Sequence, residues 1–513
     1  MLTLKKHLTK NGEIILYTGT PNLAMLEEIS NGVGDIWHSS FEQGYKNAFP
    51  ELVYQTATFF WFVKDFETLD QCISWRINPY QFAIRKSVWE ALGGFDNDFK
   101  NPQMQAFDLG YNALRFRGVV PLYIKGLFAV QETFKEPITT KDRYVFFRKN
   151  FKIDHSLFMI YRQGFWKIKE WNAFFYAKKN FKLSPDKSIV KPRDLKEITG
   201  NPSVSYIIPT MLRQDFTLQL LGDLALQTYK PTQVVVVDAT PLNQRDESLY
   251  RTENYPFELK IKWQETKGSC RARNEAIELA TGDYIVFGDD DIRIPPNYIE
   301  NHIRFLQTYN ADACNGLDIR ADHQKQNLDD LKSKLENYGS TRFLAGAAQI
   351  FNNANNCVKR EFVTQLVGND INFDGGYGED NDFGMSLTKI GVVVLQNPFS
   401  TNLHLKPPIG GYRFWGNQAK VMGKKRKKQP WELDTPVKWI RPVPSPTIMY
   451  YNYKHFGPEL VKEYRHKYFS FYLFKGSKWA IPLRFLKLFY RQLQFNKSVF
   501  YAKKLMDLGK RTA

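Results

Sequence analysis

The alternation of short apolar runs with helix-like segments in the middle of the chain most constrains its fold. Residues 203–209 (SVSYIIP) and 233–239 (QVVVVDA) have the length and apolar composition of buried strands. Residues 216–226, between them, repeat apolar side chains at helical spacing. Strands that alternate with helices predict a parallel sheet with right-handed crossover connections.

The same alternation continues toward the C-terminus. Residues 259–263 (LKIKW) alternate as a strand does, and residues 284–287 (YIVF) form another buried run. Between them, residues 269–280 predict a helix with Ser269 as its N-cap and Gly282 as its stop. We therefore predict an α/β fold, in which ligands bind beyond the carboxyl ends of the strands.

An acidic run stands at one of these strand ends. Asp289, Asp290 and Asp291 directly follow the strand at 284–287. In extended backbone, residues two apart point to the same side, so we expect Asp289 and Asp291 to converge on one cation. Oxygen ligands suit Mg²⁺ or Mn²⁺, which bridge to diphosphates. The alternative is an acidic surface turn, which the position at a strand end disfavours.

A second acidic cluster, residues 378–384 (GEDNDFG), opens a predicted helix. Acids in a first helical turn are often only caps at the positive end of the helix dipole. The functional alternative is a carboxylate that this dipole keeps ionised and that accepts a proton. His404 follows the predicted strand at 392–395; a lone histidine is more often structural, but here it would complete a metal site.

These segments resemble family 2 glycosyltransferases with a GT-A fold, of bacterial type, over residues 201–415. The motifs that carry the resemblance are SYIIPTMLR, VVVVDA, KGSCRARNEAIELATGDYIVFGDDD and GYGEDNDFGMSLTKIG. The resemblance implies a nucleotide-binding domain with a mainly parallel sheet flanked by helices, and Mn²⁺ or Mg²⁺ as cofactor. It also implies a nucleoside-diphosphate sugar donor, and it favours uridine as the base.

The resemblance also implies roles for individual residues. The nucleotide sugar is expected to bind Pro209, Thr210, Asp238, Gly268, Arg271, Arg273, Asn274, Asp289 and Asp290. Asp289, Asp291 and His404 are expected to hold the metal, and Asp380 to act as the general base with Glu379 beside it. The chain departs from the family at Ala239-Thr240, at Arg271 and in lacking a QxxRW motif. One base and no second nucleophilic carboxylate imply a single displacement with inversion.

An earlier part of the chain repeats the later half. Residues 77–120 contain GGFD and DLG, and aligning Asp108 with Asp382 places Gln105 and Ala106 where Glu379 and Asp380 stand. We therefore interpret residues 1–145 as a degenerate GT-A-like α/β module that contributes packing or acceptor contacts. An independent α/β domain with coincidental motifs is the alternative. Residues 146–200 are expected to be an aromatic, basic helical linker.

The C-terminal segment, residues 416–513, carries the charge. The chain has a net charge of +18, and this segment holds 22 Lys and Arg against 5 acids, with the basic run KKRKK at 424–428. Residues 481–493 interleave apolar and basic side chains as an interfacial helix does. We expect a basic, aromatic helical region bound to an anionic membrane surface; the alternative is that its aromatic rings pack a helical core.

Composition narrows the functional classes. Hydrophobic residues make up 43% and charged residues 24%, as in globular proteins, and no run of about 20 apolar residues exists. Four isolated cysteines suit a reducing compartment, and no secretion signal is evident at the N-terminus. We expect a cytoplasmic location, peripherally attached to the inner face of the cell membrane.

The leading hypothesis is a metal-dependent, inverting hexosyltransferase. It would move a sugar to a hydroxyl of a glycan or lipid-linked saccharide acceptor in cell-surface polysaccharide assembly. Alternatives are a membrane- or nucleic-acid-binding protein that uses the basic segment, a metal-dependent nucleotidyltransferase, and an inactive scaffold. Nucleic acid is not an expected partner, because the basic segment lacks RNP-like motifs and zinc-ligand spacing.

Overall fold

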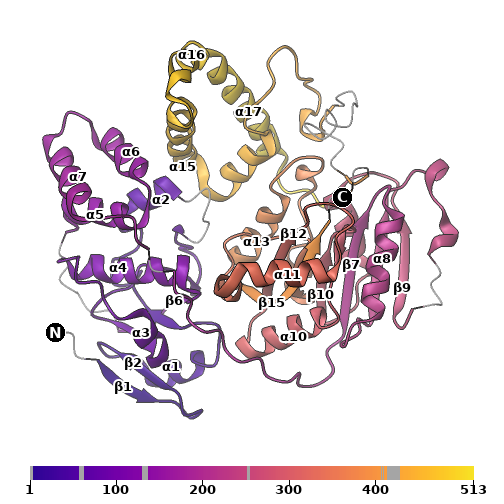
Figure 1. Cartoon of the computed structure of the whole chain (residues 1–513), viewed down its shortest axis with the longest axis horizontal. Coiled ribbons are helices and arrows are strands. Elements are labelled where there is room, and N and C mark those ends of the chain that lie inside the picture. Colours follow the sequence, from indigo (N-terminus) through magenta and orange to yellow (C-terminus); the bar gives the residue numbers. More distant parts are fainter. Residues whose placement is uncertain are drawn as a thin grey trace. The chain divides into compact units, whose positions relative to one another are not determined.

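The computed structural model describes residues 4–56, 63–129, 137–185, 187–250, 255–405, 407, 410–412 and 428–513. They fall into two compact units (Figure 1). Unit 1 comprises residues 1–192, 343–349 and 459–479, and unit 2 comprises residues 193–342, 350–458 and 480–513. Each unit has its own sheet with flanking helices. The predicted α/β fold class is confirmed.

The sheet of unit 2 has the strand order β11-β15-β12-β14-β10-β7-β8-β9. Strands β10, β7, β8 and β9 are parallel, as are β12 and β15, whereas β14 runs antiparallel between β10 and β12. The bounds are β7 Val204–Thr210, β8 Gln233–Asp238, β9 Glu258–Trp263, β10 Tyr284–Gly288, β11 Ile292–Arg293, β12 Ala313–Arg320, β14 Asn355–Lys359 and β15 Val394–His404.

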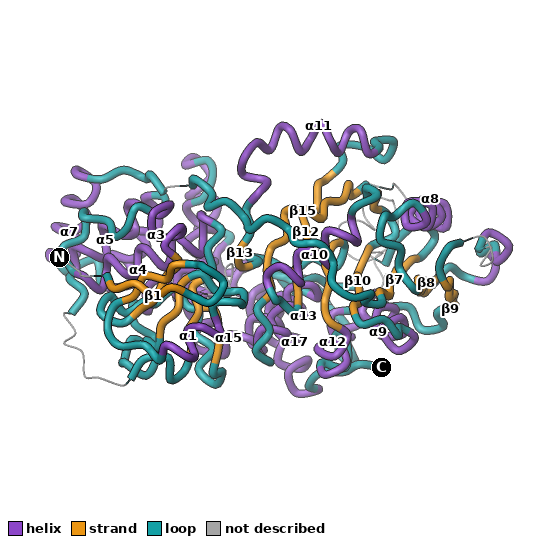
Figure 2. The backbone as a smooth tube through the Cα atoms, turned by 90° about the horizontal axis from the view of Figure 1, so that it is seen from below, coloured by secondary structure: helices purple, strands orange, loops and turns teal. Residues whose placement is uncertain are grey.

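Helices cover both faces of this sheet, and Figure 2 shows α8 on one side of the strands and α9 and α12 on the other. Their bounds are α8 Gln214–Ala225, α9 Ser269–Leu279, α10 Tyr298–Tyr309, α11 Leu328–Tyr338, α12 Arg360–Gln365 and α13 Glu379–Lys389. Every residue of β7, β8 and β10 is buried between these layers. This burial explains why the three strands read as continuous apolar runs.

Two local expectations need correction. The cap of α9 is Gly268, not Ser269, and the helix ends at Leu279 before it reaches Gly282. The strand expected at 392–395 extends from Val394 to His404, because β15 pairs with β12 both at 394–396 and, after a register shift, at 401–404. His404 is therefore the last residue of a central strand and does not lie on a loop.

The sheet of unit 1 has the order β1-β2-β5-β3-β6-β4. The bounds of its strands are β1 Lys5–Leu8, β2 Ile14–Tyr17, β3 Ile36–His38, β4 Gln71–Ile73, β5 Phe82–Arg85 and β6 Pro121–Ile124. The bounds of its helices are α1 Leu23–Ile29, α2 Pro50–Thr56, α3 Lys86–Leu92, α4 Pro102–Asn112, α5 Thr140–Asn150, α6 Ile153–Gln163 and α7 Ile168–Asn180.

The strand register of unit 1 repeats that of unit 2. In each sheet a central strand (β3 or β12) has an antiparallel neighbour (β5 or β14) and a parallel neighbour (β6 or β15). In unit 1, Ile36 of β3 lies opposite Ile84 of β5 and Pro121 of β6. In unit 2, Ala313 of β12 lies opposite Val358 of β14 and Val394 of β15. This match is the structural counterpart of the sequence repeat in residues 77–120.

The register shows which acids unit 1 lacks. Leu16 of β2 lies opposite Ile84, as Ile285 of β10 lies opposite Val358. Counting onward from these positions places Thr20 and Asn22 where unit 2 has Asp289 and Asp291. The first turn of α4 contains no acid, whereas that of α13 contains three. We therefore keep a degenerate copy as the interpretation of unit 1.

The units do not follow the expected boundaries. A boundary at 145/146 falls inside α5, whose Tyr144, Phe146 and Phe147 are buried. Because α5 packs against α7, the expected linker forms part of unit 1. The aromatic and basic composition of this segment predicted helices correctly but did not predict where the unit ends.

The C-terminal region is likewise divided between the units. Helix α15, Pro446–Phe474, is broken at Gly457 and Pro458, and the chain passes from unit 2 to unit 1 there. Helices α16, Ile481–Leu486, and α17, Leu488–Leu508, belong to unit 2. Lys424–Lys427 of the basic run lie outside the described residues. Among the described helices, none combines the length and the apolar composition needed to cross a membrane.

Replacing either of two helical glycines by alanine should change the free energy of unfolding, in opposite directions at the two positions. Replacing glycine by alanine inside a helix normally stabilises it by about 1 kcal/mol. At Gly222 of α8 an added Cβ meets nothing within 4 Å, so Gly222→Ala should raise the free energy of unfolding by about that amount. At Gly110 of α4 the Cβ would lie 2.1 Å from the Trp75 carbonyl oxygen.

Gly110→Ala should therefore lower the free energy of unfolding by about 1–3 kcal/mol despite the better helix propensity. Scanning calorimetry of the full chain measures both variants. Stabilisation by Gly110→Ala would mean that α4 does not pack this closely on Trp75.

Candidate functional site

A cavity opens where the carboxyl ends of β7, β10 and β15 meet, as expected for an α/β sheet. Side chains from the DDD turn after β10, from the start of α13 and from the end of β15 line it. The expected site residues that it brings together are Pro209, Arg273, Asp289, Asp290, Asp291, Glu379, Asp380 and His404. Five far-apart segments of sequence thus meet in one place.

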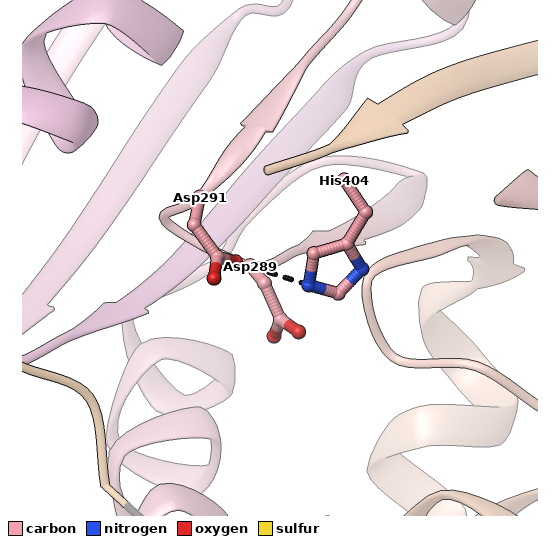
Figure 3. A group of neighbouring side chains, drawn as sticks. All are labelled: Asp289, Asp291 and His404. Carbon is pink, nitrogen blue, oxygen red and sulfur yellow. Dashed lines mark ion pairs between the residues drawn. The ribbon is translucent and has the colours of Figure 1, made fainter. Parts of the chain in front are cut away.

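The three expected metal ligands converge in this cavity (Figure 3). One ligand atom from each of Asp289, Asp291 and His404 lies within 4.8 Å of the others. The DDD segment is a turn and not extended backbone, yet Asp289 and Asp291 still face the same space. Two carboxylates and an imidazole fit Mn²⁺ well, because imidazole is a poorer ligand for Mg²⁺.

Asp318 of β12 holds the imidazole ring from the other side. His404 Nδ1 lies 3.1 Å from Asp318 Oδ1, and its Nε2 lies 3.2 Å from Asp291 Oδ1. Burial alone would lower the pKa of His404, but its bonds to the two carboxylates raise it to about 10. A carboxylate behind a ligating histidine fixes which nitrogen faces a metal, so Asp318 orients Nε2 toward the cavity.

Arg213 and Asp290 stabilise the DDD turn. Asp290 accepts hydrogen bonds from Thr210 Oγ1 at 2.8 Å and from Arg213 Nη1 at 3.0 Å. Arg213 Nη1 also lies 2.9 Å from Asp291. Burial raises the pKa of Asp290 to about 7, although Arg213 opposes the shift. Asp290 and Thr210, both expected to bind the nucleotide sugar, bond to each other and hold the turn.

The guanidinium group of Arg273 in α9 has more hydrogen-bond donors than partners among the described residues. Its Nη2 donates to Asp289 Oδ1 at 2.8 Å, and its side chain is 5% exposed. Its Nε and Nη1 atoms are buried and have no hydrogen-bond partner among the described residues. Because unpaired buried donors are costly, a charged acceptor that enters the cavity beside Asp289 is the natural partner for these two atoms.

The candidate base lies at the start of α13. Gly378 caps this helix with a φ of 103°, a left-handed conformation that favours glycine. Glu379 and Asp380 follow in the first turn, where the helix dipole favours carboxylates. Asn353 Nδ2 donates to one oxygen of Asp380 at 2.7 Å. Asp380 is half-buried and lines the cavity, so it is placed to meet a ligand there.

Asp382, two residues after Asp380, has a different role. Its carboxylate lies 2.8 Å from Lys454 Nζ and 2.7 Å from His455 Nε2, and its side chain is 4% exposed. Burial would raise the pKa of Asp382, but His455 and Lys454 lower it. Burial also lowers the pKa of His455 to about 4, so the histidine is neutral at pH 7.

Lys454 extends this network to the loop before α13. Its Nζ lies 2.8 Å from Asp370, which also accepts a hydrogen bond from Tyr450 OH at 2.7 Å. The first half of α15 thereby anchors both the helix that carries Asp380 and the preceding loop. This part of the basic C-terminal region is therefore built into the candidate site of unit 2.

Five expected donor-binding residues do not line the cavity: Thr210, described above, and Asp238, Gly268, Arg271 and Asn274. The carboxylate of Asp238 accepts hydrogen bonds from the Thr240 backbone at 2.8 Å and from Tyr250 OH at 2.9 Å. A Cβ on Gly268 would lie 2.1 Å from Asp374 Oδ2, so glycine is needed there for packing. Arg271 is half-buried outside the cavity lining.

Asn274, the last of these residues, joins three chain segments. Its Nδ2 donates to the carbonyl oxygens of Asn369 at 2.9 Å and of Thr512 at 2.8 Å. Its Oδ1 accepts the backbone N–H of Asn369 at 2.6 Å. Asn274 thus ties α9 to the C-terminal tail, and its expected contact with the nucleotide stays a prediction.

Sequence reasoning missed several residues of the site. Arg213 stands four residues after Pro209 in the motif SYIIPTMLR, and its position after a strand end was an available signal. Asp318 and Arg320 alternate on β12, so a polar pair on a central strand could have marked them. Asn353 and Lys454 carry no local signal, because their partners lie 27 and 72 residues away.

Comparison with known proteins supplies the family. A sequence model described as "Glycosyl transferase family 2" matches residues 205–362, from β7 into α12. A putative colanic acid biosynthesis glycosyl transferase, WcaA of Escherichia coli (strain K12), is 33% identical over 99 residues, which are 19% of this chain and 36% of the relative. The poly(ribitol-phosphate) beta-N-acetylglucosaminyltransferase TarS of Staphylococcus aureus (strain Mu50 / ATCC 700699) is 31% identical over 114 residues, which are 21% of this chain and 19% of the relative.

The matched segments thus span little more than a third of these relatives' own length at most. Among solved structures, the mannosyltransferase PcManGT from Pyrobaculum calidifontis in complex with GDP-Man and Mn²⁺ shares 21% identity and a TM-score of 0.35, over 61% of this chain and 89% of that one. The family match includes Asp289 and Asp291 but ends before Asp380 and His404. The chain therefore carries a family 2 glycosyltransferase domain, as its sequence motifs predicted.

Proposed function

We propose that the protein transfers a sugar, with inversion, from a nucleoside-diphosphate sugar to a hydroxyl of a glycan or lipid-linked saccharide. The observation that carries this proposal is the single cavity shared by a three-ligand metal site, a buried arginine and a carboxylate at a helix N-terminus. We keep a uridine nucleotide, a hexose and a role in cell-surface polysaccharide assembly as the expected setting. Release of UDP or GDP from a panel of sugar nucleotides tests the reaction.

Asp289, Asp291 and His404 would hold Mn²⁺ or, less favourably, Mg²⁺. Such an ion supplies positive charge that stabilises a diphosphate leaving group. Arg273 would also stabilise the diphosphate, because its Nε and Nη1 donors lie beside Asp289 and have no partner among the described residues. Arginine forms strong bidentate hydrogen bonds with phosphate, so Arg273 would bind the donor diphosphate.

Asp380 would take the proton of the acceptor hydroxyl as the new glycosidic bond forms. A sugar hydroxyl is a poor nucleophile until a base accepts its proton. The helix dipole favours the ionised carboxylate, and Asn353 orients it by donating a hydrogen bond to its Oδ1. Glu379 lines the same cavity beside it.

The alternatives explain less of this geometry. A metal-dependent nucleotidyltransferase would use the same aspartates but would leave the carboxylates at the start of α13 without a role. A protein that only binds nucleic acid or membranes would not need a metal site in its core. The expected attachment to an anionic membrane does not compete with catalysis.

Asp289→Asn and Asp291→Asn should abolish the Mn²⁺-dependent part of sugar-nucleotide binding and leave the fold intact. Thermal melting with and without Mn²⁺ measures this, because a ligand that binds only the folded state raises the melting temperature. Asp312→Asn is the matched control, since Asp312 pairs with Lys359 outside the cavity. Wild-type Mn²⁺ stimulation in both site variants would show that the metal binds elsewhere.

Asp380→Asn should reduce transfer about 10²–10⁴-fold while donor binding is preserved, because only the proton acceptor is lost. Asparagine keeps the shape of the side chain and its contact with Asn353. Single-turnover transfer and donor titration on the same variant separate the two effects. Transfer within a few-fold of wild type would move the base to another residue, and Glu379 is then the first candidate.

Asp382→Asn should instead destabilise the protein, by about 3 kcal/mol, because His455 loses its buried carboxylate partner and Lys454 loses one of its two. The free energy of unfolding in urea measures this. Asp380→Asn is the paired control and should change stability by less than about 1 kcal/mol. Equal stability of the two variants would remove the anchoring role that we assign to Asp382.

A further inference from the structure

Large apolar side chains are exposed where α16 passes into α17. Leu483, Phe485, Leu486, Phe489 and Tyr490 are 52%, 51%, 81%, 73% and 47% exposed, and we call these five residues the α16–α17 surface. Further along α17, Phe495, Tyr501 and Leu505 are fully buried. The helix thus already has an inward face, and the α16–α17 surface is additional to it.

The charge along this part of unit 2 has one sign. Residues 480–506 contain six Lys and Arg and no Asp or Glu. Lys487 lies between the exposed Leu486 and Phe489 and is itself exposed. Arg484 and Arg491 are partly exposed on either side of it. Exposed aromatic rings and leucines with cations around them are typical of a helix that lies in a membrane interface.

We propose that the α16–α17 surface docks the protein on an anionic lipid bilayer. The apolar side chains enter the boundary between headgroups and acyl chains, and Arg484, Lys487 and Arg491 contact the anionic headgroups. This inference rests on the exposed surface and on its charge, and it does not depend on the proposed glycosyl transfer.

Two other occupants fit the surface less well. A second copy related by a two-fold axis would set the same basic residues against one another, which like-charge repulsion opposes. A nucleic acid would satisfy the cations but would not bury Leu483 and Leu486, which offer no ring for base stacking. A bilayer satisfies both the apolar and the cationic groups.

Deleting the whole C-terminal region would not test this proposal. Such a deletion also removes Lys454, His455 and the tail that contacts Asn274, so it would disrupt the candidate site. Single substitutions on the surface avoid this problem. Leu486→Glu and Phe489→Glu remove an inserted side chain and add a negative charge; Phe489→Ser makes the apolar change alone.

The matched control is Leu226→Glu, which adds the same charge at a leucine that is 72% exposed at the end of α8. Vesicle flotation of the full chain compares phosphatidylglycerol–phosphatidylcholine vesicles with phosphatidylcholine vesicles, at low and high salt. We expect binding only to the anionic vesicles, weakened by salt. Loss of one inserted Leu or Phe should reduce the partition coefficient about tenfold or more, and Leu226→Glu should bind like wild type.

Circular dichroism and thermal melting confirm that each variant folds, and Phe489→Ser keeps the test valid if an added charge disturbs the helix. Equal binding to neutral and anionic vesicles, no binding to either, or unchanged binding by Leu486→Glu and Phe489→Glu would overturn the proposal. So would salt-sensitive binding of RNA without any binding of vesicles. Self-association that Leu486→Glu abolishes, without vesicle binding, would assign the surface to a second copy.

Discussion

The crowding of five carboxylates into one cavity is the constraint on which the candidate site depends. Asp289, Asp290, Asp291, Glu379 and Asp380 share this space, and like charges at such distances raise one another's energy. Arg213 and Arg273 offset much of this repulsion, each with a carboxylate within 3.0 Å. Two donors on Arg273 have no partner within the described part of the chain, so the site is arranged to receive a further acceptor.

A second layer of ion pairs fixes the elements that carry these groups. Asp318 orients His404, and Lys454 with His455 anchors Asp382 in the first turn of α13. The C-terminal region therefore has two separate tasks in our account. The first half of α15 and the tail support the site of unit 2, whereas the α16–α17 surface faces outward with apolar and basic side chains.

Local patterns allowed much of the fold and of the candidate site to be predicted. The strands β7, β8 and β10 and the helices α8 and α9 were found within a few residues, because burial on both faces leaves continuous apolar runs. Asp289, Asp291 and His404 were grouped correctly in space by their motif spacing and resemblance. Their roles remain proposals.

The contacts that the sequence did not predict are non-local. Asp238 and Asn274 match family motifs, and their side chains bond to Tyr250 and to the C-terminal tail. No window of sequence links Asp382 to Lys454, so the cations of the basic segment were expected only at the surface. Anomalous diffraction from crystals grown with Mn²⁺ and a nucleoside diphosphate tests the central claim most directly. We predict a manganese peak between Asp289, Asp291 and His404, with the diphosphate beside Arg273; nucleotide bound without metal there, or manganese bound elsewhere, would contradict the account.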